Sequence, residues 1–302
     1  MLNQFITHSI IPLKYFFLLP SLRPRSVSHS KNSVNSDFSV SKIGKEVIEF
    51  NIIWLNFITR KKIIFLISEI LKKYNIEKYN DDIAYILMEL ISNGIKARYL
   101  HIITMKCLKN LYPSYNQKID KEEYFNDNEI MAQYSDLFKE KENKEKLKKL
   151  MKLEKSLIKD MDENNNINIL EDERYKELLS FRENDKNKFI IKLIIEIKKN
   201  NIEFSIINDS PLIMINKTRI DSKRLTFKEY YNKGMTENFF MEQLDNSESA
   251  GFGLALCDLR LYNNGLNPHE HLKIYDENNK TYSKLILPIK QTFNYSLSHN
   301  KY

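Results

Sequence analysis

Glu89 and Asn93 are the first residues whose types and spacing could form a binding site. They lie four positions apart in the segment ELISNGIKA, residues 89–97, and side chains four positions apart project from the same side of a helix. A carboxylate and an amide in this arrangement can hold a hydrated magnesium ion, which needs only one or two protein oxygens besides water and phosphate. The same side also carries Lys96. An ordinary solvent-facing Glu and Asn is the alternative interpretation.

A second candidate is the segment IINDSPL, residues 206–212. Its apolar residues are typical of a strand, and the strand pattern stops at Asn208, Asp209 and Ser210. An amide or carboxylate oxygen at the end of a strand can accept a hydrogen bond from the exocyclic amine of a purine. Because Asn, Asp, Ser and Pro are also the usual turn residues, a plain turn is the alternative.

The third candidate is the segment DNSESAGFGLAL, residues 245–256. The chain has only 6 glycines, and two of them flank Phe252. Polar residues precede these glycines and an apolar helical run follows them, ending near Leu261. Glycines let a backbone approach a ligand closely, and the free N–H groups at the start of a helix favour phosphate. A flexible loop before a core helix is the alternative.

Taken in this order, the three segments resemble the nucleotide-binding boxes of the GHKL superfamily, which includes histidine kinases, DNA gyrase B and MutL. Residues 89–97 resemble the N box, the strand that ends at Asn208 resembles the first glycine box, and residues 251–254 resemble the second. The resemblance covers residues 60–289, with a charged insertion between the boxes. The usual Asp-x-Gly-x-Gly of the first glycine box reads NDSPL at residues 208–212.

The resemblance implies an ATP site with magnesium, between a helix layer and a lid. Asn93 would coordinate the magnesium ion, and Glu89 would match the general base that orients water in the hydrolysing members. Lys96 would lie near the phosphates, with Ala97 beside it in the same box.

The two glycine boxes would complete this ATP site. Asn208 falls at the position of the adenine-binding Asp of the family; in a register shifted by one residue, Asp209 takes this role, with Ser210 next to it. The phosphates would be wrapped by residues 251–254, which are Gly251, Phe252, Gly253 and Leu254.

The predicted function is that of a histidine kinase-like ATP-binding protein in signal transduction. It would bind Mg-ATP and transfer phosphate to a protein partner, or regulate that partner, as an ATPase or protein kinase of this class. None of the six histidines lies in the phosphoacceptor pattern of a complete sensor kinase, which argues against autophosphorylation on histidine. The alternative is a non-catalytic adaptor of the same fold that acts through protein–protein interaction.

Several elements must position these segments. Helical spacing predicts helices over residues 45–74 and 82–98, and an apolar run predicts a strand over residues 100–105. Alternating patterns predict strands over 189–198 and 202–208 and a terminal hairpin over 272–289. Together they predict an α+β fold, a two-layer α/β sandwich with helices on one face of a mixed sheet.

Residues 110–188 differ from the rest because charge is dense and residues 139–159 are almost all Lys, Glu and Leu. Apolar residues from Leu147 to Met161 recur at helical spacing, which predicts an amphipathic helix. This helix either packs on the domain through its leucine stripe or binds a partner, and a homodimer through the insertion would be one such case. The predicted domain organisation is a flexible segment at 1–44, an ATPase-like domain in two parts at 45–109 and 189–290, the helical insertion at 110–188 and a tail at 291–302.

Composition excludes other classes of protein. The chain has 302 residues and a formal net charge of +7, but its Lys and Glu residues are interleaved, which argues against a dedicated nucleic-acid binder. Two cysteines exclude a disulfide scaffold and indicate a reducing, cytoplasmic location. The sequence contains no P-loop, HExxH or GxSxG motif. Its apolar run at residues 10–20 is too short to span a bilayer, and no transmembrane segment is expected.

Overall fold

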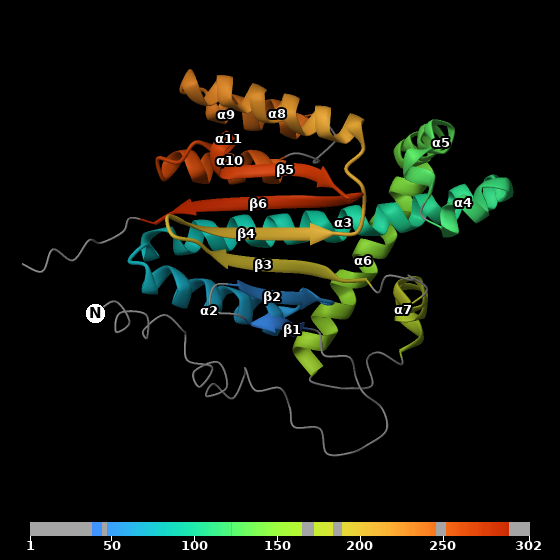
Figure 1. Cartoon of the computed structure of the whole chain (residues 1–302), viewed down its shortest axis with the longest axis horizontal. Coiled ribbons are helices and arrows are strands. Elements are labelled where there is room, and N and C mark those ends of the chain that lie inside the picture. The colour runs from blue at the N-terminus through green and yellow to red at the C-terminus, as the bar shows by residue number, and fades with distance from the viewer. Residues whose placement is uncertain are drawn as a thin grey trace, which may run out of the picture.

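The computed structural model describes residues 38–43, 47–121, 123–164, 172–183, 189–245 and 252–289. One antiparallel sheet and a layer of helices make up the described chain (Figure 1). The strands are β1 (Phe38–Ile43), β2 (Val47–Ile52), β3 (Ile191–Ile197), β4 (Asn201–Asn208), β5 (Leu272–Glu277) and β6 (Lys280–Pro288). The helices before β3 are α2 (Phe57–Lys73), α3 (Asn80–Leu111), α4 (Asn116–Asp120), α5 (Asn128–Lys139), α6 (Lys141–Asn164) and α7 (Lys176–Glu183). The helices after β4 are α8 (Met214–Asn232), α9 (Thr236–Asp245), α10 (Phe252–Asn263) and α11 (Pro268–His271).

The strand order is β1-β2-β3-β4-β6-β5, and each neighbouring pair is antiparallel. The two-layer α/β sandwich is therefore confirmed, but the prediction of a mixed sheet is wrong for the described strands. The reason lies in the last crossover. Helices α8 to α11 connect β4 to β5, which run parallel to each other, but β6 lies between them and is antiparallel to both. β4 and β5 therefore run in the same direction, but no two neighbouring strands of the described sheet form a parallel pair.

The faces of the central strands follow the predicted alternation. Ile191, Leu193 and Ile195 are fully buried and belong to the core under the helix layer, whereas Lys192 lies on the other face. Figure 1 shows α2 and α3 behind the sheet, on the buried face. The terminal hairpin is also confirmed, and its two-residue turn places Asn278 at φ 51° and Asn279 at φ 59°, as tight hairpins of this kind require.

The longest helix, α3, contradicts two predictions. It runs without a break from Asn80 to Leu111, so it does not end at Arg98, and residues 100–105 are helical instead of forming a strand. Residues 100–104 are all buried, and the insertion covers this part of α3, where His101 packs against Tyr134 of α5. A helix buried on all sides loses the polar stripe by which a sequence reveals it.

The chain before α3 also differs from the prediction. Residues 47–52 form β2, and the predicted helix over 45–74 begins only at Phe57, where Asn56 caps it by accepting a hydrogen bond from the Thr59 N–H at 2.8 Å. Residues 38–43, within the segment predicted to be flexible, form the edge strand β1. β2 pairs with β3, which lies far away in the sequence, and β1 joins the sheet only through its pairing with β2.

The insertion packs on the domain through its leucine stripe, so this interpretation is confirmed. Leu150 and Leu157 of α6 are fully buried and belong to the same core cluster as the strand residues. Arg182 of α7 and Glu154 of α6 form a buried ion pair beneath this surface. Among the described residues, none of the helices has the length and apolar character that crossing a bilayer requires.

Candidate functional site

One side of α3 carries the N-box residues. The Asn93 Nδ2 donates a hydrogen bond to the Glu89 Oε1 at 3.1 Å, so the two side chains lie together as their spacing predicted. Both are partly exposed. Lys96 lies exposed less than a turn beyond Asn93, and Ala97 is partly buried beside it. The four residues therefore form one partly solvent-accessible stripe along α3.

The second glycine segment lies directly on this stripe. A Cβ atom built at Gly253 would lie 1.9 Å from the Glu89 Oε1 and 2.3 Å from its Cδ, so only glycine fits at the first turn of α10 while Glu89 keeps its place. This contact accounts for one of the few glycines in the chain. Phe252 and Leu254, on either side, are partly buried; Gly251 lies outside the described residues.

A seam of polar contacts fixes α10 against α3. Arg260 of α10 and Asn264, the residue after this helix, both donate hydrogen bonds to the Asp82 carboxylate near the start of α3, and the Arg260 guanidinium lies 4.1 Å from the centre of the Tyr85 ring. Because Asp82 meets the C-terminal end of α10 and Glu89 meets its N-terminal end, the two helices run antiparallel. The seam holds Gly253 against Glu89.

Asn208, at the end of β4, faces the same helix. It is only 4% exposed, and its Nδ2 lies 3.6 Å from the position that a Cβ would take at Gly94 of α3. Its Oδ1 accepts a hydrogen bond from the Ser210 N–H at 3.1 Å and a second one from the Ser210 hydroxyl. Residues 208–210 therefore form a turn that the Asn208 side chain closes, and the amide nitrogen of this side chain lies next to α3.

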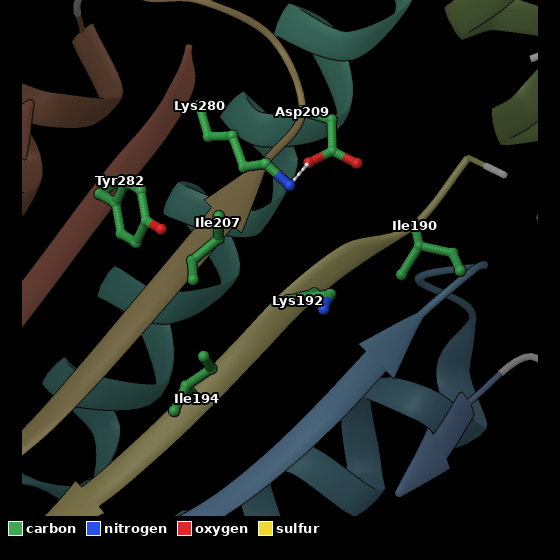
Figure 2. A pocket seen from close by; sticks show the side chains of 7 residues that line it. All are labelled: Ile190, Lys192, Ile194, Ile207, Asp209, Lys280 and Tyr282. Atoms are coloured by element: carbon green, nitrogen blue, oxygen red, sulfur yellow. Dashed lines mark ion pairs between the residues drawn. The ribbon is translucent and has the colours of Figure 1, made fainter. Parts of the chain in front are cut away.

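Asp209 points away from α3. Its carboxylate pairs with the Lys280 ammonium at 2.8 Å, and both line a hollow of about 270 Å³ on the outer face of the sheet. Figure 2 shows this hollow with Ile207 and Tyr282 in its wall and α3 behind the strands. Of the two registers that the sequence allows, the structure brings only Asn208 next to the N-box residues.

Arg98 is a residue that sequence reasoning missed. It is 2% exposed and donates a hydrogen bond from α3 to the Asp209 carbonyl oxygen. Thr281 of β6 supports the next carbonyl, that of Ser210, through its N–H at 3.0 Å and its hydroxyl at 2.7 Å. The turn after β4 is thus held from two sides. An arginine within the apolar run of α3 was the available signal, since a buried cation needs acceptors.

The chemistry around Glu89 is that of binding rather than thiol catalysis. Burial raises the pKa of the nearby Cys257 thiol, and the Glu89 charge adds to this rise, so the thiol stays protonated at neutral pH. Among the residues that the structure describes, no three His, Cys, Asp or Glu side chains converge to hold a metal ion. The groups present are a carboxylate, two amides and an ammonium group beside the start of a helix.

Comparisons with known proteins add no assignment to this geometry: no protein-family model matches the chain, and the searches of curated proteins and of solved structures found no match.

Proposed function

We propose that this chain is a histidine kinase-like module that binds a magnesium nucleoside triphosphate and transfers phosphate to a protein partner or regulates that partner. ATP is the nucleotide that the resemblance to the GHKL superfamily implies. The observation that carries the proposal is the meeting of three distant segments on one stretch of α3. Gly253 contacts Glu89, Glu89 binds Asn93, and Asn208 lies beside Gly94.

The Asn93 amide has the orientation that a magnesium ligand needs. Its Nδ2 donates to Glu89, which leaves the Oδ1 to accept, and an amide oxygen is a ligand that magnesium takes together with water and phosphate oxygens. When bound, the ion would supply charge neutralisation at the phosphates. Lys96, exposed on the same stripe, would add a second positive charge near them.

Glu89 is proposed as the general base that orients water or an acceptor hydroxyl. Because Glu89 and Gly253 are already in contact, the triphosphate in this proposal lies beside that contact, over Asn93 and Lys96, rather than between the two segments. From there it would meet the N–H groups of the first turn of α10, which is where helix dipole and free donors favour an anion.

Nucleotide binding by the full chain tests the proposal. With magnesium present, millimolar ATP or GTP should raise the melting temperature, because a ligand that binds only the folded state stabilises it. Asn93→Ala should abolish the shift, and Lys96→Ala should weaken it without lowering the melting temperature of the free protein. Asn263→Ala, an exposed asparagine at the other end of α10, serves as the control. No shift with either nucleotide would refute the proposal.

An adaptor role is the second candidate, and one surface favours it. A hollow of about 450 Å³ lies between α5 and the start of α8, lined in part by Met131, Ile213 and Met214, and Met214 is 83% exposed. Methionine-rich surfaces suit protein partners. The leucine stripe of α6 is covered by the chain's own core, so in this alternative proposal a partner or a second copy of the chain binds at the methionine-lined hollow instead.

Sedimentation velocity separates the adaptor role from the nucleotide proposal. Self-association that rises with concentration and is lost in Met214→Glu, without any nucleotide-dependent thermal shift, would select the adaptor. The two free thiols, Cys107 and Cys257, suit a reducing compartment, and we propose the cytoplasm.

A further inference from the structure

We propose, resting on the proposed nucleotide site, that the base read by Asn208 is a 6-oxopurine, guanine or hypoxanthine, rather than adenine. The reason is that Asn208 presents a hydrogen-bond donor to the site. The resemblance alone implies the opposite, an acceptor that meets the amino group of adenine. The proposal thus concerns this chain's own residue and its neighbours.

The orientation of the Asn208 amide follows from its backbone partner. The Ser210 main-chain N–H, 3.1 Å from the Oδ1, can only donate, so the oxygen of the amide must face it and the nitrogen must face the other way. Hydroxyl partners leave amide orientations open, but a backbone N–H does not. The Ser210 hydroxyl gives the same oxygen a second donor.

The Asn208 nitrogen is left as an unpaired donor. It makes no hydrogen bond with any residue in the described part of the chain, although the side chain is 96% buried. It is directed toward α3 at Gly94, the residue after Asn93. A donor that has no acceptor within the protein is available to a ligand, and an acceptor atom on a bound ligand would pair with it.

Adenine and the 6-oxopurines differ in the hydrogen-bonding group at ring position 6. Adenine carries an amino group at position 6, which is a donor, whereas guanine and hypoxanthine carry a carbonyl oxygen there, which is an acceptor. A donor facing a donor leaves both unpaired. Sites built around a buried hydrogen-bonding group discriminate most strongly against a ligand that leaves this group unpaired.

The turn is held so that the amide cannot easily reverse. Arg98 binds the Asp209 carbonyl, and Thr281 binds the Ser210 carbonyl through two hydrogen bonds. Reversal of the amide would place its NH₂ group against the Ser210 N–H and cost the bond that closes the turn. The donor is therefore preorganised, which is the condition for selectivity.

The test is a competition experiment with the full chain and magnesium, measuring the dissociation constants of GTP, ITP and ATP. GTP and ITP should bind at least about tenfold more tightly than ATP. ITP is included because it has the 6-oxo group but lacks the 2-amino group of guanine, so it isolates position 6. Asn208→Asp should invert the preference toward ATP, because a carboxylate has a second oxygen that can accept from the amino group.

Two variants keep the result interpretable. Asn208→Ala should bring the GTP to ATP ratio near one, which decides the question if the buried carboxylate of Asn208→Asp prevents folding. Asp209→Asn, whose side chain lies on the other face of the sheet, should leave the ratio unchanged. ATP binding as tightly as GTP in the native chain would overturn the 6-oxopurine inference but leave the proposed function standing. Failure of all three nucleotides to bind would overturn the proposed function itself.

Discussion

Replacement of Arg182 by Met should destabilise the fold severely. The Arg182 and Glu154 side chains are only 5% and 4% exposed, and removal of one member of such a pair leaves an uncompensated buried charge. The expected loss is about 3–5 kcal/mol, a large share of the roughly 5–15 kcal/mol that stabilises a typical protein.

The surroundings of Arg182 explain why this residue, rather than Glu154, dominates the loss. Its guanidinium lies 3.6 Å from the centre of the Trp54 ring and 4.0 Å from that of Phe189, and it donates to the Ile53 carbonyl. Glu154 has a single oxygen near Arg182, at 3.4 Å, and its Oε2 has no hydrogen-bond partner among the described residues. Glu154→Gln should therefore cost about 1 kcal/mol.

The pH dependence gives a second readout. Burial raises the pKa of Glu154, and the Arg182 charge opposes this rise. A carboxyl group with a raised pKa in the folded state stabilises the protein below its unfolded pKa, and this stabilisation is lost as the pH rises through the folded pKa. Arg182→Met removes the opposing charge, so this variant should regain stability as the pH falls from 7 to 5.

Urea unfolding monitored by circular dichroism measures these free energies. Lys149→Met is the matched control, since Lys149 and Glu177 join the same two helices, α6 and α7, at 2.6 Å but are 61% and 48% exposed; its cost should stay below about 1 kcal/mol. The double variant Arg182→Met/Glu154→Leu should recover most of the loss. A loss below about 1 kcal/mol for Arg182→Met would refute the reasoning that α7 is held by a buried charge.

Three further predictions concern other buried groups. Burial, with the Arg98 charge, lowers the pKa of His101 to about 3. The neutral imidazole therefore stabilises the fold fully above the unfolded pKa of histidine, and this stabilisation is lost as the pH falls; between pH 7 and 5 the free energy of unfolding should drop by about 2 kcal/mol. His101→Gln should remove this pH dependence in the same urea assay. Gly253→Ala should displace the Glu89 side chain and lower the stability of the fold. Gly94→Ala should be neutral or stabilising by up to about 1 kcal/mol, because its new Cβ would have only ordinary contacts at 3.5–3.7 Å. Equal effects of the two variants on stability would contradict the close contact at Gly253. Arg224→Met should cost about 3–5 kcal/mol, because Arg224 binds both oxygens of the buried Asp258 at 2.8 and 2.9 Å; a variant as stable as the native chain by calorimetry would count against this.

The sheet was the part of the fold most open to prediction. Ile191, Leu193 and Ile195 recur at every second position, with Lys192 among the residues between them, and the two asparagines at 278–279 mark the last hairpin. The strand β2 was missed although Ile48, Phe50 and Ile52 also alternate, because its stabilising partner is β3 and a local pattern does not reveal a partner so distant in sequence.

The candidate site was likewise predictable where it depends on local spacing, but not where it depends on contacts between distant segments. The spacing of Glu89 and Asn93 was sufficient to predict that they share one side of a helix, and the structure shows their hydrogen bond. The contact of Glu89 with Gly253 depends on the seam formed by Asp82 and Arg260, and charged surface residues give no sign of such pairing in a sequence. Which of Asn208 and Asp209 faces α3 depended on the register of β4.

The pairing of β2 with β3 has a consequence for how the protein is made. Ile52 pairs with Ile191, so about 140 residues must leave the ribosome before the second strand of the sheet meets its partner. At 5–20 residues per second, this wait lasts roughly 7–30 s. During translation the apolar side chains Ile48, Phe50 and Ile52 lack their later strand neighbour, so apolar surface that the finished sheet covers is open on the nascent chain.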